Sequence, residues 1–328
     1  MKSQKDIKLN VLMFRMMLTI RYTEEIIAER YKNQEMKTPV HLGIGQEAPA
    51  VAVCTNLISG DAVFSHHRAH NHFLASGGSI FSLVAELHGR VGGCSRGRGG
   101  SVHLTHTNKI FFASNAILGE STALAAGSAL SFKLQKQKNI GVSFFGDATW
   151  EEGVLYETLN FAAIHALPIL FVCENNLYAT ESPLSVRKPS RSNFIDRAKS
   201  FGIEAHRLDG NDLVELQQKI SEIISEIRVN PAPIVIECET YRWKEHVGVR
   251  FDHELGREYR DLNELNEWQK KDPISRMQGY LLLNNILTLR DVQSLKHEVQ
   301  LEVEHEFELA RLSPFPDPDS LFLNSGEI

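Results

Sequence analysis

The stretch IGVSFFGDATWEEG (140–153) joins a short apolar run to a Gly-Asp-Ala turn and then to a segment with helical spacing. Similar apolar runs follow at PILFVCE (168–174), IEAHRL (203–208) and PIVIECE (233–239), with helix-like segments between them. Strands that alternate with helices predict a parallel sheet, and strands that are apolar throughout predict helices over both faces. We therefore expect an α/β fold with a doubly wound, mostly parallel sheet.

The flanking segments complete this unit. Residues 7–34 carry apolar positions at spacings of three and four, which predicts a long amphipathic helix. The chain from 261 onward is helical in pattern, so we expect a single domain over 1–328 in which 261–328 is a helical C-terminal extension. Residues 35–118 are rich in glycine and histidine, and long loops of this kind in a compact domain are usually functional. Short helices are expected there near 46–57 and 79–88.

Composition excludes several classes of partner. The 328 residues are 42% hydrophobic, and 35 Lys+Arg against 41 Asp+Glu give a net charge of −6 without a basic block. Neither nucleic acid nor a membrane surface is therefore an expected partner. No apolar run of about 18 residues is present to span a bilayer. The polar start MKSQKDIKLN (1–10) has neither signal-peptide nor transit-peptide character, so a cytoplasmic location is expected. The four cysteines lie far apart and are expected to be reduced core thiols.

Two polar residues follow consecutive predicted strands. Asp147 comes directly after the run 140–145, and Asn176 follows the run 168–174. Ligands of parallel sheets bind beyond the carboxyl ends of the strands, where these oxygens would meet. Mg²⁺ prefers about six oxygen ligands and often shares its shell with phosphate, so the pair suggests a diphosphate ligand. The alternative is that Asp147 caps the next helix and Asn176 stabilises a turn.

Histidine and arginine are concentrated in HHRAHNH (66–72), with His41 before it and Arg242 and His246 much later. Both side chains donate hydrogen bonds to phosphate oxygens, and arginine can do so in bidentate fashion. The four histidines of the run could instead bind zinc, but no cysteine or carboxylate nearby in sequence completes the set. A phosphate site is therefore the preferred interpretation.

The segment GGCSRGRGGS (92–101) is similarly open to more than one interpretation. It resembles an RGG-type RNA-binding sequence, although it is a single short instance in an acidic chain. Dense glycine also lets the backbone approach a ligand, or simply forms a turn. Spacing alone does not separate these last two possibilities.

Taken together, these motifs resemble the alpha subunits of the thiamine diphosphate-dependent 2-oxo acid dehydrogenases, the family of the pyruvate, branched-chain 2-oxo acid and acetoin dehydrogenases. The resemblance covers most of the chain. Seven blocks occur in the order of the family: HLGIGQEA (41–48), HRAH (67–70), GRVGGCSRGRGGSVH (89–103), NAILG (115–119), GDATWEEG (146–153), ENNLYA (174–179) and ETYRWKEH (239–246). It implies a thiamine diphosphate-binding fold.

The resemblance also implies roles for individual residues. Asp147, Asn176 and the carbonyl of Tyr178 would bind Mg²⁺. The diphosphate side of the cofactor would be bound by His41, His67, Arg68, Arg242 and His246, with Ala148 and Thr149 nearby. The backbone of Ala116 and Leu118 would contact the aminopyrimidine. His70 and His246 are candidates for proton transfer.

The implied activity is that of an oxidoreductase. The cofactor would decarboxylate a small 2-oxo acid, and the acyl group would pass to a lipoyl-bearing acyltransferase or another acceptor. Because the activating carboxylate comes from a beta subunit in this family, the chain is expected to be an alpha subunit, inactive alone and assembled as an α2β2 heterotetramer.

Some residues depart from the family pattern. His67 stands where the family often has tyrosine, Ala148 and Ala116 replace glycines, and Glu120 places an acid beside the expected cofactor loop. These changes leave the acceptor open and favour, as an alternative, a carboligase or ketol transferase subunit of a specialised biosynthetic pathway. A third hypothesis is a scaffold subunit that has lost cofactor binding.

Overall fold

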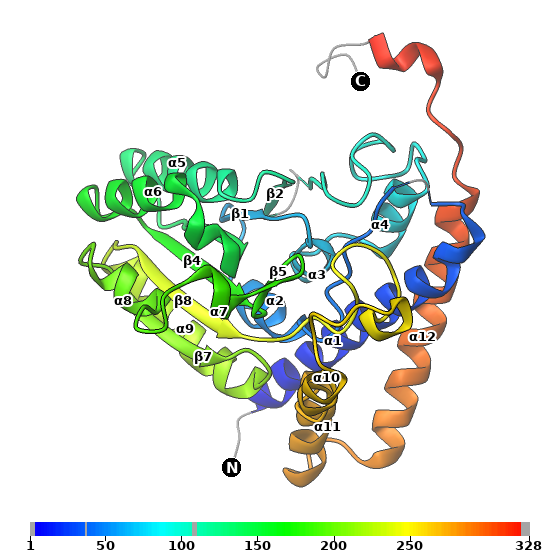
Figure 1. Ribbon diagram of the computed structural model, residues 1–328. Coiled ribbons are helices and arrows are strands. Elements are labelled where there is room, and N and C mark those ends of the chain that lie inside the picture. Colours follow the sequence, from blue (N-terminus) through cyan, green and yellow to red (C-terminus); the bar gives the residue numbers. More distant parts are fainter. Residues whose placement is uncertain (1–3, 37, 107–109, 323–328) are drawn as a thin grey trace.

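A six-stranded sheet forms the centre of the molecule (Figure 1). The structure, a computed structural model, describes residues 4–36, 38–106 and 110–322. All neighbouring strands of the sheet are parallel, which confirms the predicted class of fold. In spatial order the strands are β2 (Phe111–Ser114), β1 (Ala62–Ser65), β3 (Gly141–Gly146), β4 (Ile169–Asn175), β8 (Ile234–Glu239) and β7 (Glu204–Asp209).

Side chains of the central strands alternate between two hydrophobic cores. On β3 and β4, Phe144 and Val172 belong to one core, whereas Phe145 and Phe171 belong to the other. Successive side chains of a strand point to opposite faces, so both faces of the sheet are buried. This explains why the strand sequences are apolar throughout.

Each face is covered by its own helices (Figure 1). One core is completed by the alanine-rich α5 and by α6 and α8, and the other mainly by α1, α2 and α9. The long helix expected over 7–34 is α1, which ends four residues earlier, at Arg30. The bounds of these helices are α1 (Gln4–Arg30), α2 (Glu47–Cys54), α5 (Glu120–Leu134), α6 (Gly153–Ile164), α8 (Phe194–Lys199) and α9 (Leu213–Val229).

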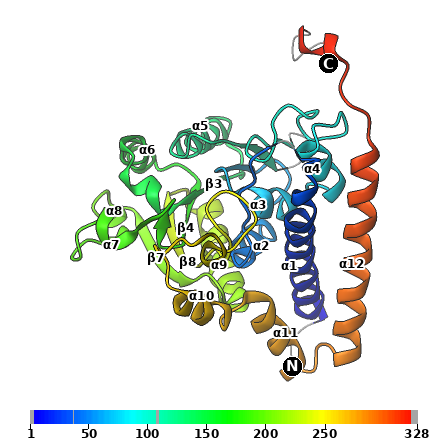
Figure 2. The same cartoon turned by 45° about the vertical axis from the view of Figure 1, so that its right-hand side comes forward.

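The expected C-terminal helices are α10 (Leu262–Gln269), α11 (Pro273–Leu283) and α12 (Leu289–Leu312). Helix α12 lies alongside α1 and contacts α4 (Ile80–Leu87), as both views show (Figures 1 and 2). Its residues Val299, Val303 and Phe307 are buried in the core that contains α1. The C-terminal helices therefore share a core with the N-terminal helix.

Among the described residues no helix is both long and apolar enough to cross a membrane. The four cysteines are free, and all but Cys94 are buried.

Short elements connect the main helices and strands. The remaining elements are α3 (His70–Ala75), α7 (Leu184–Arg187), the pair β5 (Tyr178–Ala179) and β6 (Ser182–Pro183), and the 3-10 turns η1 (Tyr31–Asn33), η2 (Asp147–Glu151), η3 (Asp252–Leu255) and η4 (Pro318–Phe322).

The glycine-rich segment 92–101 is organised by one buried carboxylate. Glu86, at the end of α4, accepts hydrogen bonds from the backbone amides of Ser95 (2.7 Å), Gly97 (2.9 Å), Gly99 (2.6 Å) and Gly100 (3.1 Å). Gly97 has a φ of 75°, and a Cβ there would lie 2.5 Å from the backbone of residue 89. The glycines thus allow a tight turn around Glu86, which favours the structural interpretation of this segment.

Candidate active site

A cavity of about 390 Å³ lies where β3 and β4 end, at the edge of the sheet where ligands of parallel sheets bind. Segments far apart in sequence form its wall: the loop before α2, the loop between β1 and α3, the turns after β3 and β4, and the loop after β8. Most of the predicted site residues line it, namely His41, His67, Arg68, Ala116, Leu118, Asp147, Ala148, Asn176, Tyr178 and His246.

The two expected metal ligands emerge at neighbouring strand ends. Gly146 of β3 pairs with Glu174 of β4, so Asp147 and Asn176 follow adjacent strands at the same edge. The backbone amide of Asn176 donates a hydrogen bond to Asp147. The side-chain oxygen of Asn176 also accepts a hydrogen bond from the amide of Tyr178 at 3.3 Å, as expected for a turn. The structure therefore brings the two residues together and also shows the turn-stabilising role.

Arg187, the last residue of α7, is the counter-ion of Asp147. Its guanidinium forms an ion pair with the Asp147 carboxylate and a second one with Glu151 at 2.6 Å. Burial raises the pKa of Asp147, and the charge of Arg187 acts in the opposite direction. A buried carboxylate needs such a partner, and a divalent ion would meet the same need.

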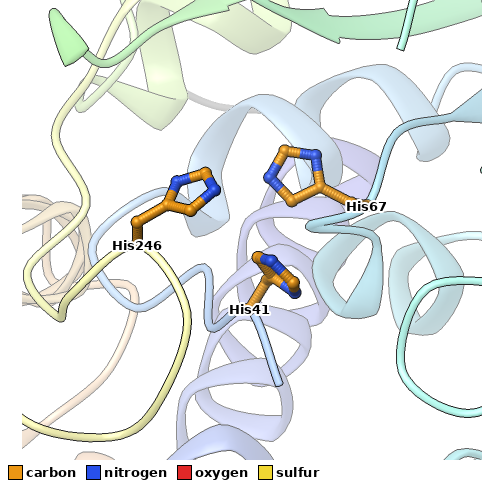
Figure 3. A group of neighbouring side chains, drawn as sticks. All are labelled: His41, His67 and His246. Atoms are coloured by element: carbon orange, nitrogen blue, oxygen red, sulfur yellow. The ribbon is translucent and has the colours of Figure 1, made fainter. Parts of the chain in front are cut away.

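Three histidines surround one part of the cavity (Figure 3). The ring centroids of His41 and His67 are 4.6 Å apart, and the ring of His246 lies 5.3 Å from each of the other two. Burial, followed by the nearby charge of Arg68, lowers the pKa of His41 and of His246 to about 3. The pKa of His67 is also well below its ordinary value. The three imidazoles are therefore neutral at pH 7 without an anion beside them.

Arg68 is buried beside them, and no carboxylate among the described residues accepts a hydrogen bond from it. Its guanidinium donates to the carbonyls of Leu42 (2.7 Å) and His246 (3.1 Å). Burial, with repulsion from Arg242, lowers the pKa of Arg68 to about 9. Two buried arginines in electrostatic contact constitute a positive site that an anion would stabilise.

Glu174 forms the carboxylate part of a second histidine cluster. Its oxygens lie 3.2 Å from Nε2 of His66 and 3.2 Å from Nε2 of His72. No carboxylate lies near the histidine run in sequence, but folding supplies one from β4. The backbone amide of Arg68 donates to Nδ1 of His66, so in neutral His66 the proton lies on Nε2 and points to Glu174. This tautomer favours a hydrogen-bonded cluster over a metal site.

Three predicted site residues are not on the cavity wall. His70 is fully buried, with Nδ1 3.2 Å from Glu24 and Nε2 2.9 Å from Ser101, so proton transfer to a substrate would first require both contacts to break. Arg242 binds the carbonyls of residues 180 and 244 and the hydroxyl of Tyr259. Thr149 is buried, and its hydroxyl has no hydrogen-bond partner within residues 4–36, 38–106 and 110–322. The partners of His70 in α1 and in the loop could not be predicted from the sequence.

The donor set fits a diphosphate with a divalent ion. Nδ1 of His41, Nε2 of His67 and Nε of Arg242 are buried polar atoms for which the described residues supply no hydrogen-bond partner. His41, His67 and Arg68 line the cavity and so offer donors or acceptors to an anion there, whereas Arg242 lies outside its wall. Asp147 and Asn176 offer the oxygen ligands that Mg²⁺ prefers. The residues present therefore match the chemistry of both groups.

Comparison with known proteins identifies the family of the chain. Residues 15–319 match the family described as "Dehydrogenase E1 component". The alpha subunit of the acetoin:2,6-dichlorophenolindophenol oxidoreductase of Bacillus subtilis is 33% identical over 94% of this chain and 91% of its own length. The pyruvate dehydrogenase E1 component subunit alpha of Rhizobium meliloti is 32% identical over 94% and 87%, and chloroplastic subunit alpha-3 of Arabidopsis thaliana is 33% identical over 94% and 72%.

The structure is thus an α/β fold with a cavity at the carboxyl edge of its parallel sheet, lined by histidine, arginine and acidic side chains. The chain belongs to the dehydrogenase E1 component family, as an alpha-type member. This confirms the family resemblance and the class of enzyme, a decarboxylating oxidoreductase of the 2-oxo acid dehydrogenase group. Thiamine diphosphate is the cofactor of this family.

Two residues of the site were given no role from the sequence. Glu174 is part of the quoted ENN motif, and its position at the end of an apolar strand was a usable signal. Arg187 lies 40 residues after Asp147 in a polar stretch, and only the turn formed by β5, β6 and α7 returns it to the strand end. Nothing in the local sequence indicates that contact.

Proposed function

We propose that this chain is the alpha subunit of a thiamine diphosphate- and Mg²⁺-dependent enzyme that decarboxylates a 2-oxo acid and transfers the acyl group to a lipoyl or other acceptor. The observation that supports this most directly is the meeting of Asp147 and Asn176 with Arg68 at one cavity. The four free cysteines support a reducing, cytoplasmic location.

In this proposal the chain holds and orients the cofactor. Asp147, Asn176 and the carbonyl of Tyr178 bind Mg²⁺. Arg68 and the histidines at 41, 67 and 246 bind the diphosphate, and its charge would raise the low pKa values of His41 and His246. When bound, the cofactor supplies a carbanion that attacks the keto carbon and an electron sink for loss of CO₂. His246, on the cavity wall, is the proposed residue for proton transfer.

The proposal includes a partner. Relatives named as alpha subunits support a beta subunit, and an α2β2 assembly with a carboxylate from the beta subunit would complete the site. The test is decarboxylation of a 2-oxo acid with an artificial electron acceptor, with and without the beta partner. Little turnover alone and restored turnover with the partner are expected. Full activity of the isolated chain would contradict the division of labour.

Control measurements separate the other hypotheses. A carbon–carbon bonded product from pyruvate and an aldehyde, formed without oxidant, would identify a carboligase or ketol transferase. Failure of thiamine diphosphate and Mg²⁺ to bind in calorimetric titration of the assembled protein would identify a scaffold subunit.

A further inference from the structure

The cavity contains a cluster that differs chemically from the Mg²⁺ site. One side-chain nitrogen from each of His41, His67 and His246 lies within 4.8 Å of those of the other two. The rings come from three separate segments and surround a common space (Figure 3). They are inclined to one another by 78°, 85° and 49°, so they do not stack. Three inclined imidazoles around one point resemble the ligand set of a three-histidine metal site.

Two of these rings have unused nitrogen atoms. Nδ1 of His41 and Nε2 of His67 are buried and have no hydrogen-bond partner in the described part of the chain. A buried imidazole nitrogen without a partner destabilises the fold, because its hydrogen bond to water is lost on burial and no other hydrogen bond replaces it. In the cluster of His66, His72 and Glu174, by contrast, both histidine Nε2 atoms contact the carboxylate. Only the first cluster therefore presents nitrogen atoms that require an external ligand.

We propose that His41, His67 and His246 bind one borderline divalent ion, Zn²⁺ or an ion of similar preference, with a fourth ligand from the cavity. Imidazole suits Zn²⁺, Cu²⁺ and Ni²⁺, whereas Mg²⁺ prefers oxygen ligands such as those of Asp147 and Asn176. The two ions would therefore occupy different sites. Because the same histidines are proposed to bind diphosphate, the ion and the cofactor would exclude each other. This mutual exclusion rests on the proposed function.

The charge of Arg68 determines the fourth ligand. Arg68 donates to the carbonyl of His246 at 3.1 Å, so its positive charge lies close to the cluster and opposes a bare cation. An anionic fourth ligand, such as hydroxide or inorganic phosphate, would offset this repulsion. We therefore expect metal binding to strengthen when inorganic phosphate is present at low concentration.

The test uses the full chain, free of cofactor and Mg²⁺, titrated with Co²⁺. Tetrahedral Co²⁺ absorbs visible light far more strongly than octahedral Co²⁺, so binding at the histidines differs spectroscopically from binding at the oxygens of Asp147. We expect one tetrahedral Co²⁺ per chain, displaced by Zn²⁺. The variant His67→Gln should lose the spectrum, and His246→Gln provides a second variant in another segment. His165→Gln, at the exposed residue that follows α6, is the matched control and should retain it.

The results separate this inference from the proposed function. Absence of the tetrahedral spectrum, or its persistence in folded His67→Gln and His246→Gln, would overturn the metal site, whatever the cofactor does. Displacement of Co²⁺ by thiamine diphosphate with Mg²⁺ would support the shared site. If calorimetry shows that the cofactor binds but the Co²⁺ spectrum does not change, the mutual exclusion of ion and cofactor would be overturned.

Discussion

The ion pair with Arg187 determines which charged partner the buried carboxylate of Asp147 has. The Asp147 carboxylate is buried, and the only cation paired with it among the described residues is Arg187. The proposed binding of Mg²⁺ at Asp147 would have to displace or share this guanidinium. Arg187 also contacts Glu151 at 2.6 Å, which offers it an alternative partner when the ion binds.

The first prediction concerns this competition. Arg187→Met should tighten Mg²⁺ binding about tenfold or more, because a hydrogen bond to a charged group contributes about 1.5–3 kcal/mol and would no longer have to be broken. Mn²⁺ binding to the assembled enzyme with thiamine diphosphate, followed by electron paramagnetic resonance, measures the effect. Arg187→Lys should change the affinity less. Weaker binding in Arg187→Met would show that the arginine assists the metal instead.

Glu174 leads to a prediction about pH. Burial alone would raise its pKa, but His72 and His66 outweigh burial and lower the pKa to about 2, below the ordinary 4.5. A depressed carboxyl pKa stabilises the fold above pH 4.5, and this contribution is lost as the pH falls toward 2. Glu174→Gln should therefore cost about 2–4 kcal/mol at pH 7, from two buried charge-assisted hydrogen bonds.

Urea unfolding from pH 7 down to pH 3 checks this sign. The difference in free energy of unfolding between the two proteins should shrink as the pH falls below 4.5. Glu237→Gln, on the neighbouring strand, is a comparison variant, because Glu237 is equally buried but its partners are Asn175 and Arg207 instead of histidines. A difference that does not depend on pH would contradict the assigned charge state.

At the scale of elements, α4 and the glycine-rich segment form one unit through Glu86. Four backbone amides of the segment donate to its carboxylate, and Ser101 at the end of the segment contacts His70. Glu86→Gln removes the negative charge and presents an NH₂ group toward amide donors. We expect faster hydrogen exchange at residues 95–100, by about tenfold or more per charge-assisted hydrogen bond lost.

Hydrogen-exchange mass spectrometry measures this change, and peptides from β3 and β4 are the internal control. Protection there should not alter. Glu151→Gln, at the exposed end of η2, serves as a comparison variant. Unchanged exchange at 95–100 would mean that the glycine turns hold the segment without the carboxylate.

Some of the secondary-structure elements can be predicted from the sequence, and others cannot. Strands β3, β4, β7 and β8 follow from apolar runs, and the position of Asp147 and Asn176 follows from the rule for parallel sheets. The four-residue strands β1 and β2 give no periodic signal, and they were not predicted. The contacts of Glu86, His70 and Arg187 join residues that are distant in sequence or lack a pattern, so only the folded chain reveals them.

At the scale of the molecule, we propose that residues 1–328 form one cooperative unit, with 261–328 as its extension. Phe307 of α12 is buried in the core that also contains α1 and the sheet. Phe307→Ala should cost about 3–5 kcal/mol and lower the midpoint of a single unfolding transition. Leu309→Ala, at an exposed position of the same helix, should change the free energy of unfolding little.

Circular dichroism and tryptophan fluorescence together check this prediction. Coincident transitions are expected in both proteins. A separate early transition in Phe307→Ala, with the sheet still folded, would show that α12 is an independent unit.

The central claim is that Asp147 anchors a divalent ion that holds thiamine diphosphate in the cavity. Calorimetric titration of thiamine diphosphate into the assembled enzyme, with Mg²⁺ or with EDTA, tests it directly in the wild type and in Asp147→Asn. We predict Mg²⁺-dependent binding in the wild type and its loss in the variant, since removal of a charged ligand should cost several kcal/mol. Equal binding of the cofactor by the folded variant would contradict the claim.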